Sequence, residues 1–331
     1  MTDVIKSNVT IVLPLKDRIP YTLRWMNYAN VCKLPFKILI ADGGKENNLQ
    51  NILTKESYPN LDFEYLRYPF DRSFSEYYSK LVDVVSKVET PFVVMADNDQ
   101  FPIKIGIEAS ADFLQKNSDY IACAGKSVSC TVRDHNGHSS LQGKVRFTLI
   151  RQDKSIEFNT ARERIVMQFS NHILTYYDVH RTNVLLDHFR ILRILDIKDV
   201  YLAEEFLTIW LVASGKIKRV PELSLVRQTN TTSANPIVYG QNDALSRMFI
   251  ESWSKDFYGY IEVVAEVANS IDKTSLDENK KLIRECHMEQ FVRNFKSRLN
   301  VSLISLIKKK VFLLNKNSLL WKIIYWLYTT Y

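Results

Sequence analysis

The strongest constraint on the fold is an alternation of apolar runs and amphipathic segments along the N-terminal third of the chain. The apolar runs are continuous, which is typical of parallel strands that are buried on both faces. They cover residues 9–15, 36–41, 61–67 and 91–96, and helices are expected at residues 20–32 and 74–88. Strands that alternate with helices in this way predict an α/β domain with a mostly parallel sheet flanked by helices.

Each of these expected strands ends in charged or turn-forming residues. The carboxyl ends of parallel strands lie at one edge of a sheet, which is where α/β proteins bind their ligands. We therefore expect four segments to gather at one site: Lys16-Asp17-Arg18, Asp42-Gly43-Gly44, Asp71-Arg72-Ser73 and Asp97-Asn98-Asp99.

The acidic triplet after the fourth strand is the strongest single motif. Asp97 and Asp99 stand two residues apart, and paired carboxylates suit a hard divalent cation such as Mn²⁺ or Mg²⁺. Such a cation can bridge the two phosphates of a nucleotide and neutralise the charge of a departing diphosphate. The alternative is an Asx-rich turn that caps a helix beginning near Pro102.

The rest of the chain is expected to continue the α/β pattern and then to become helical. Strands are expected at 120–125, 145–150 and 217–221, helices at 103–116, 161–169, 182–191 and 203–214, and a polar loop or hairpin tip at 133–143. Residues 172–178 are expected to form an aromatic-rich strand or loop. Beyond Arg227 the pattern predicts long helices at 242–268 and 279–299.

Charge and cysteine content narrow the class of protein. The net charge of +7 is concentrated in a C-terminal tail that carries lysines and no acids, and no nucleic-acid-binding signature accompanies it. We therefore expect no nucleic-acid partner. The four cysteines form no C-x-x-C pair and no zinc spacing, which predicts reduced thiols. The N-terminus lacks the apolar stretch of a signal peptide, and a cytoplasmic location is expected.

Residues 299–331 form two apolar blocks divided by lysines, with Trp and Tyr at the boundaries. This pattern predicts a basic amphipathic helix on an anionic membrane surface, at the inner face of the plasma membrane. No apolar run reaches the roughly 20 residues of a spanning helix. The alternative is a helix docked on the protein's own body or on a second copy in a homodimer.

The order of these segments resembles the family 2-type GT-A glycosyltransferases, in particular bacterial surface-polysaccharide enzymes, over residues 9–221. The resemblance implies a GT-A fold, which is a Rossmann-like sheet flanked by helices, here with a C-terminal helical extension. It implies a nucleoside diphosphate sugar donor and a divalent metal at Asp97 and Asp99, with Asp99 the more direct ligand. The donor-binding residues that it implies are Pro14, Lys16, Asp17, Arg18, Asp42, Gly43, Arg72, Asp97 and Asn98.

Several of these residues also have simpler interpretations. Asp17 and Arg18 could form a solvated turn, and Asp42-Gly43 is an ordinary turn dipeptide. Arg72 precedes Ser73, which has the chemistry of a helix N-cap.

Two acids in the second half are candidates for the catalytic base. Glu204 and Glu205 precede an apolar helical segment, a stop at Gly215 and a strand at 217–222. This order resembles the family's acidic motif, whose aspartate is the general base in inverting members. Glu205 occupies that place and Glu204 is its rival. The alternative is that two acids at a helix start complement the helix dipole.

Two histidines bracket the segment in which the family builds its acceptor pocket. His172 is a candidate metal ligand, and either His172 or His180 could touch the acceptor or the diphosphate. The alternative for both is a structural role.

Taken together, the sequence predicts a metal-dependent, inverting glycosyltransferase of surface-polysaccharide synthesis, acting on a glycan or lipid-linked acceptor. The expected parts are a nucleotide-sugar-binding half at 1–125, an acceptor-binding half at 126–227, a helical extension at 228–298 and a membrane-associating tail at 299–331. The rival functions are a non-catalytic partner subunit on a degenerate transferase fold and a sugar-phosphate nucleotidyltransferase. The second would need a glycine-rich loop after the first strand, and residues 14–20 contain no glycine. A dinucleotide-dependent oxidoreductase is not expected, because no G-x-G-x-x-G follows a strand.

Overall fold

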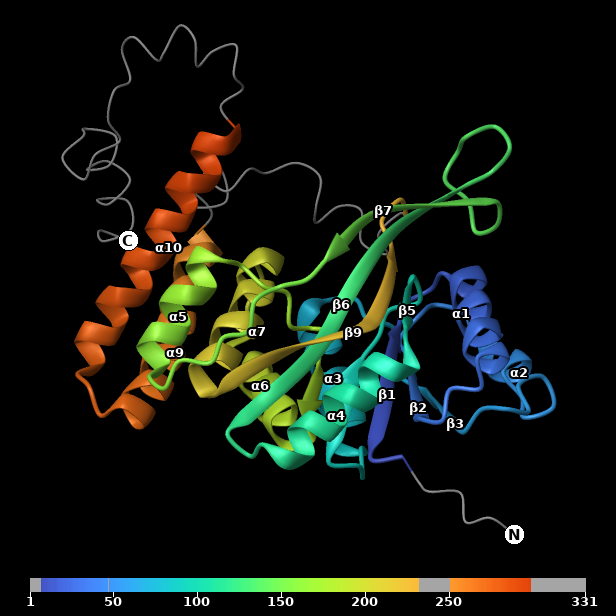
Figure 1. The fold of residues 1–331 in the computed structure, drawn as a ribbon, viewed down its shortest axis with the longest axis horizontal. Coiled ribbons are helices and arrows are strands. Elements are labelled where there is room, and N and C mark those ends of the chain that lie inside the picture. Colours follow the sequence, from blue (N-terminus) through green and yellow to red (C-terminus); the bar gives the residue numbers. More distant parts are fainter. Residues whose placement is uncertain (1–6, 47, 232–250, 299–331) are drawn as a thin grey trace, which may run out of the picture.

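The computed structural model describes residues 7–46, 48–231 and 251–298. Its centre is a nine-stranded mixed sheet in the order β3-β2-β1-β4-β8-β6-β9-β5, with β7 paired to β6 (Figure 1). The strands are β1 Val9–Leu15, β2 Lys37–Asp42, β3 Phe63–Arg67, β4 Phe92–Met95, β5 Gln100–Pro102, β6 Tyr120–Arg133, β7 Lys144–Arg151, β8 Val179–Arg181 and β9 Lys216–Gln228.

The first four strands run parallel, as the alternation predicts. β8 is antiparallel to both β4 and β6, whereas β6 and β9 are parallel to each other, and β5 is antiparallel to β9. The expected α/β class with a mostly parallel sheet is therefore confirmed.

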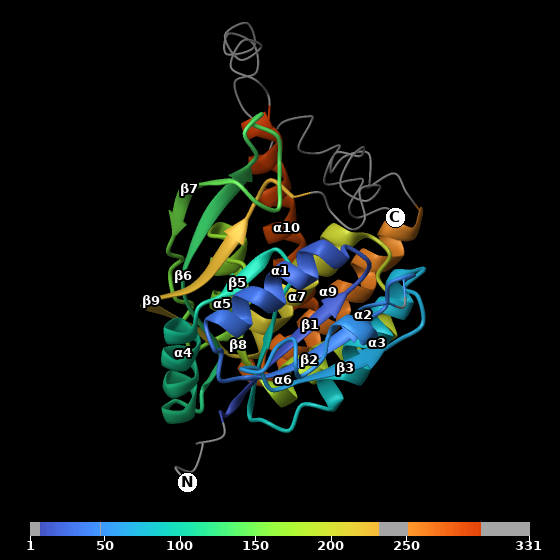
Figure 2. The ribbon, with the colours of Figure 1, turned by 90° about the vertical axis from the view of Figure 1, so that its right-hand side faces the viewer.

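Helices cover both faces of this sheet (Figure 2). They are α1 Ile19–Val31, α2 Leu49–Ile52, α3 Phe74–Ser86, α4 Lys104–Lys116, α5 Ala161–Ser170, α6 Thr182–Leu195, α7 Val200–Ser214, α9 Glu251–Asp272 and α10 Leu276–Arg298. Successive side chains of a strand point to opposite faces. Ile11 and Leu13 accordingly join a core with α1 and α4, whereas Val12 joins a second core with α3, α6 and α7.

The C-terminal helices belong to the second of these cores. Phe257 of α9 and Phe291 of α10 pack in the same apolar cluster as Phe206 of α7. α5, α9 and α10 lie together at the end of the molecule opposite α1 and α2 (Figure 1). The extension is therefore packed as an integral part of the fold. Part of the helix expected at 242–268 lies outside the described residues.

Several boundaries differ from the sequence-based expectation. β6 and β9 are longer than expected because each continues into the projecting part of the sheet, where they pair with each other and β6 also pairs with β7. The short strand β5 had no sequence signal. The polar segment at 133–143 is the tip between β6 and β7, as expected. The tail at 299–331 lies outside the described residues.

Two local details explain how helices begin near the strand ends. Ser73 caps α3 in a capping box with Glu76, so the expected capping role of Ser73 is confirmed. α7 begins at Val200, capped by Asp199, and not near Ala203 as expected. Within the described segments, no helix is long and apolar enough to cross a membrane.

A buried ion pair fastens the loop before β8 to the sheet. Arg219 of β9 donates from Nη1 to Oδ2 of Asp178 at 2.7 Å, and from Nη2 to the carbonyl of Leu174 at 2.9 Å. The two charged side chains are only 4% and 5% exposed. Burial raises the pKa of Asp178 to about 6, although Arg219 opposes the rise. The pair therefore sets the position of the residues between Leu174 and Asp178.

We expect Arg219→Met to lower the free energy of unfolding by about 3–5 kcal/mol, because it leaves a buried carboxylate without its partner. The double variant Arg219→Met/Asp178→Asn should recover most of the loss. Urea unfolding followed by circular dichroism measures both. A loss below about 1 kcal/mol in the single variant would contradict a buried pair and match an exposed one.

Candidate active site

The candidate site lies where β1, β2 and β4 end. Asp17 after β1 accepts a hydrogen bond at 2.7 Å from the backbone N–H of Lys45, which follows β2. Arg18 donates from Nη2 to Oδ2 of Asp99, after β4, at 3.0 Å. The structure thus brings three of the predicted segments together. The fourth joins them because the N–H of Asp71 bonds to the carbonyl of Gly43 at 3.0 Å.

The acid pair at the centre of this edge is held by hydrogen bonds on one oxygen of each carboxylate. Oδ2 of Asp99 accepts from Arg18 and, at 2.7 Å, from the hydroxyl of Thr231. Oδ2 of Asp97 accepts from the hydroxyl of Tyr177 at 2.5 Å. Asn98 between them is buried and donates to Thr22 at 3.2 Å. Asn98 therefore anchors the turn to α1, while the two acids flank it.

Burial raises the pKa of Asp97 to about 6, and the negative charge of Asp99 adds to the rise. The hydrogen bond from Tyr177 and the cations Arg227 and Arg18 lower the pKa in opposition. A carboxylate whose pKa lies near 6 is still mostly ionised at neutral pH. Asp97 can therefore serve as a cation ligand there, and it loses that capacity as the pH falls.

The backbone after β1 is strained. Asp17 and Arg18 have φ values of 59° and 62°, a left-handed conformation that non-glycine residues seldom adopt twice in succession. Such strain costs free energy and gathers at functional sites. It aims the Arg18 guanidinium at Asp99 and over the ring of Tyr21, 4.2 Å from the ring centre. Asp17 and Arg18 are thus more ordered than the expected alternative, a solvated turn.

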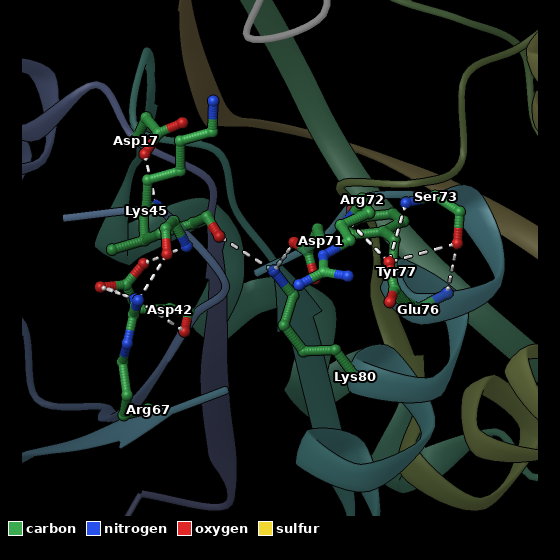
Figure 3. Close-up of polar contacts among 12 residues, drawn as sticks. Asp17, Asp42, Lys45, Arg67, Asp71, Arg72, Ser73, Glu76, Tyr77 and Lys80 are labelled. Carbon is green, nitrogen blue, oxygen red and sulfur yellow. Dashed lines mark hydrogen bonds and ion pairs between the residues drawn. The ribbon is translucent and has the colours of Figure 1, made fainter. Parts of the chain in front are cut away.

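The carboxylate of Asp42 bonds to other groups of the fold. It accepts from the N–H of Gly44 at 2.8 Å and from the hydroxyl of Tyr65 at 2.6 Å. It also pairs with Arg67 at 3.0 Å, and both Asp42 and Arg67 are labelled in Figure 3. The residue is 1% exposed. In this conformation Asp42 stabilises the turn, as its simpler interpretation predicts, and a contact with the base or ribose stays a prediction.

Gly43 is required by close packing. A Cβ atom there would lie 2.5 Å from the carboxylate of Asp71, which forms a buried ion pair with Lys80 of α3. Lys80 also donates to the carbonyl of Leu15 at 2.9 Å. Lys80 therefore joins the middle of α3 both to the end of β1 and to Asp71, and Figure 3 shows its contact with Asp71.

Three residues that were expected to contact the sugar nucleotide differ from one another in burial. Pro14 is buried inside β1 and paired in register with Ala41, so it does not lie on the exposed edge. Lys16 places its amine 5.1 Å from the centre of the Phe70 ring. Arg72 is exposed, and its backbone N–H donates to Glu76 at 2.6 Å. Lys16 and Arg72 thus remain open to a ligand, whereas Pro14 would need the strand to move.

Glu204 and Glu205 lie in the second turn of α7, and not at its start as expected. The dipole explanation is weakened, since that effect falls off within the first turn. Glu204 is exposed, whereas Glu205 is partly buried with its Oε1 3.1 Å from Nε2 of His287 in α10. Desolvation lowers the pKa of His172, and the charge of Glu205 partly offsets this. His172 therefore lies near Glu205.

The two histidines that bracket the acceptor segment differ. His180 is fully buried in β8 with Nε2 2.7 Å from the carbonyl of Thr175, and burial lowers its pKa to about 4. It is structural. His172 is exposed, and its Nδ1 lies 3.3 Å from the amide nitrogen of Gln168. Across the part of the chain that is described, no three His, Cys, Asp or Glu side chains are grouped to hold a metal ion. His172 therefore does not complete a three-ligand site with Asp97 and Asp99.

Two residues at the acid pair were missed by the sequence analysis. Arg227 is exposed near the end of β9, opposite Gln100 in the pairing with β5, and its charge lowers the pKa of Asp97. Tyr177 donates to Asp97. The position of Tyr177 in an aromatic-rich segment was a signal, but Arg227 had none, because β5 and the length of β9 were unknown.

No protein-family model matches the chain, and no curated protein matches it. Several crystal structures of S. aureus TarS are similar in fold. One has 13% identity and a TM-score of 0.48, covering 89% of this chain and 46% of that chain, so this chain spans about half the length of that TarS structure. TarS 1–349 in complex with UDP-GlcNAc has 13% identity and a TM-score of 0.49, covering 89% and 76%. TarS 1–349 in complex with UDP has 14% identity and a TM-score of 0.46, covering 92% and 75%.

We expect Mn²⁺ binding to weaken as the pH falls through about 6, because Asp97 must be ionised to ligate a cation. Removing the Tyr177 hydrogen bond removes an interaction that lowers this pKa. Tyr177→Phe should therefore raise the pH at which Mn²⁺ binding is half lost, which is the midpoint of the pH dependence. Isothermal titration calorimetry with Mn²⁺ from pH 5 to pH 8 measures the midpoint.

Tyr176→Phe is the matched control, since the Tyr176 hydroxyl bonds to Tyr77 and not to Asp97. Its midpoint should stay at the wild-type value. An equal shift in both variants would show that general loosening of the loop, and not the hydrogen bond to Asp97, controls the titration.

Proposed function

We propose that this protein is a metal-dependent GT-A glycosyltransferase that moves a sugar from a nucleoside diphosphate sugar to a glycan or lipid-linked acceptor, with inversion. The observation that carries the proposal is the acid pair Asp97 and Asp99 at the carboxyl edge of a mostly parallel sheet, flanked by Arg18 and Arg227. Acids and cations gathered at this edge suit a ligand that carries both a metal and phosphates.

The side chains of Asp97 and Asp99 are suitable ligands for a hard divalent cation. The two carboxylates offer oxygen ligands, and the hydrogen bonds described for each fall on Oδ2. Asp97 and Asp99 would hold Mn²⁺ or Mg²⁺, with Tyr177 keeping Asp97 in place. When bound, the cation would neutralise charge on the departing diphosphate. His172 is not included in this set.

Basic side chains of the protein would supply the positive charge and the nucleotide contacts that the transfer needs. Arg227 would contribute positive charge beside the leaving diphosphate. Arg18 would shift from Asp99 toward the phosphates as the cation arrives. Lys16 and Arg72 would contact the nucleotide from the rim of the site.

We assign the role of general base to Glu205. The acceptor hydroxyl oxygen attacks the anomeric carbon, its proton passes to the Glu205 carboxylate, and the bond from that carbon to the diphosphate oxygen breaks. Glu205 holds the place of the base in the resembling motif, and its side chain is partly buried whereas Glu204 is exposed, which supports this choice over Glu204. A cytoplasmic position on the plasma membrane, through residues 299–331, is part of the same proposal.

Nucleotide binding tests the donor site. We expect UDP, GDP, CMP or dTDP to raise the melting temperature in the presence of Mn²⁺ and not with EDTA, measured by differential scanning fluorimetry. A ligand at about 100 times its Kd adds roughly 2.7 kcal/mol of stability. Asp99→Asn should abolish the shift, because the amide keeps the shape but loses the charge that holds the cation.

Lys116→Gln at the end of α4 is the control for that experiment, since it removes an exposed cation just before β6 begins, at the edge of the sheet opposite the carboxyl end of β4. It should keep the wild-type shift. If no nucleotide stabilises the wild type under either condition, the transferase proposal fails and the non-catalytic partner subunit becomes the better interpretation.

The base is tested by comparing two neighbouring acids. Glu205→Gln should lower turnover roughly 10²- to 10⁴-fold, the usual contribution of a general base. Glu204→Gln should stay within a few-fold of the wild type. Turnover is measured as nucleotide release from a panel of donors that includes UDP-N-acetylglucosamine. The reverse ranking would transfer the role to Glu204.

A further inference from the structure

One contact joins the candidate base to the C-terminal helices. Nε2 of His287, in the middle of α10, lies 3.1 Å from Oε1 of Glu205 in α7. The two residues are 82 positions apart in the chain (287 − 205), and they meet only because α10 packs beside α5, α7 and α9. The His287 side chain is 11% exposed and that of Glu205 is 17% exposed.

The imidazole of His287 is held in place by aromatic rings. Its centre lies 4.7 Å from that of Phe257, 6.1 Å from Trp253 and 6.2 Å from Phe169. These rings come from α9 and α5, so two neighbouring helices restrict the orientation of the histidine. A ring that is confined in this way offers Nε2 to Glu205 from a defined direction.

Packing alone gives no reason for a histidine at this position. The neighbouring inward residues of α10 are apolar: Ile283, Met288, Phe291 and Val292. An imidazole among apolar groups costs free energy unless its polar atoms have partners. A phenylalanine or leucine would fill the same space without that cost, but neither could place a polar atom 3.1 Å from Oε1 of Glu205, as the histidine does.

We propose that His287 is a positioning residue that holds Oε1 of Glu205 and thereby directs Oε2 toward the acceptor hydroxyl. The inference rests on the proposed function, in which Glu205 is the base. Oε1 is fully buried and accepts no described hydrogen bond, so Nε2 of His287, at 3.1 Å, is the polar group that lies beside it, whereas the side chain as a whole keeps some exposure. One carboxylate oxygen is thus committed to α10, and the other is left for the reaction.

Only one proton moves in the proposed transfer. Nε2 of His287 lies 3.1 Å from Oε1 of Glu205, and the histidine takes no part in the proton transfer. The proton of the acceptor hydroxyl goes to Glu205 and not to the histidine. The role of α10 is therefore to orient the carboxylate, since a misplaced base loses much of the advantage of proximity.

The test compares His287→Phe with His287→Gln in the full chain. Phenylalanine fills the aromatic surroundings but cannot donate, whereas the glutamine amide places a donor nitrogen near the position of Nε2. We expect kcat for UDP-N-acetylglucosamine hydrolysis, measured as UDP release, to fall at least tenfold in His287→Phe with an unchanged donor KM. His287→Gln should restore kcat to within about threefold of the wild type.

Asn279→Ala is the control for a merely structural effect. Asn279 is the other buried polar residue of α10, and its amide donates to the carbonyl of Ala265 at 3.4 Å, away from Glu205. It should lower the melting temperature and leave kcat unchanged. Wild-type kcat in His287→Phe, or equal losses in the Phe and Gln variants, would overturn the positioning role.

A double-variant cycle of Glu205→Gln and His287→Phe separates this inference from the proposed function. The losses in unfolding free energy, measured by urea unfolding, are compared between the single and double variants. If the two side chains interact, the loss in the double variant should differ from the sum of the two single losses, whatever the enzyme's activity. Additive losses would overturn the contact itself. If the cycle shows coupling but the wild type turns over no donor, the proposed function fails, and the catalytic role of His287 fails with it.

Discussion

The parallel pairing of β1 with β2 on one side and with β4 on the other determines where every residue of the candidate site can lie. In β1, the carbonyl of Leu15 faces β2 and accepts from Gly43, whereas the carbonyl of Val12 faces β4 and accepts from Ala96. Pro14 alternates with Leu15 and so faces the β4 side, beyond the last β1–β4 pair of Val12 with Met95. A proline is tolerated there because no neighbouring strand needs its missing N–H. The strands separate at this point, and the loops that follow them can form a site.

Buried charges support that site from below and from the side. Lys80 joins Asp71 to the end of β1, and Arg219 of β9 pairs with Asp178 in the loop that carries Tyr177. Each pair is costly to desolvate and is compensated only when both partners are present. Their effect is to hold loops that would otherwise have few restraints. Tyr177 reaches Asp97 because the residues around it are held from β9.

The C-terminal helices connect the fold to the chemistry in a different way. α9 and α10 share the core of α3, α6 and α7, so they stabilise one face of the sheet. Through His287 they also contact Glu205, the acid that we assign as the base. In the proposed mechanism, the extension would thereby help to position the base without carrying a residue that touches the substrate.

The sequence by itself determined the α/β class, the first four strands and the edge at which their ends meet. These follow from apolar periodicity and from turn residues, which are local properties of a chain that must bury one or both faces of each element. It also singled out Asp97 and Asp99, because paired carboxylates at the end of a buried strand suit a hard divalent cation, although an Asx-rich turn was the alternative. Arg18 and Asp42 were chosen correctly as members of that edge, although their partners were not.

Tertiary structure alone decided which side chains those residues meet. Arg18 pairs with Asp99, Arg227 approaches Asp97, and His287 contacts Glu205 across distances in the chain that no periodicity records. Each depends on the register of long strands or on the packing of helices against a shared core. Asp42 and Pro14 are inside the fold for the same reason, since burial at a strand end depends on what packs over it. A local sequence pattern predicts that a residue lies at the edge of the sheet. Long-range packing decides whether its side chain is exposed to a ligand there.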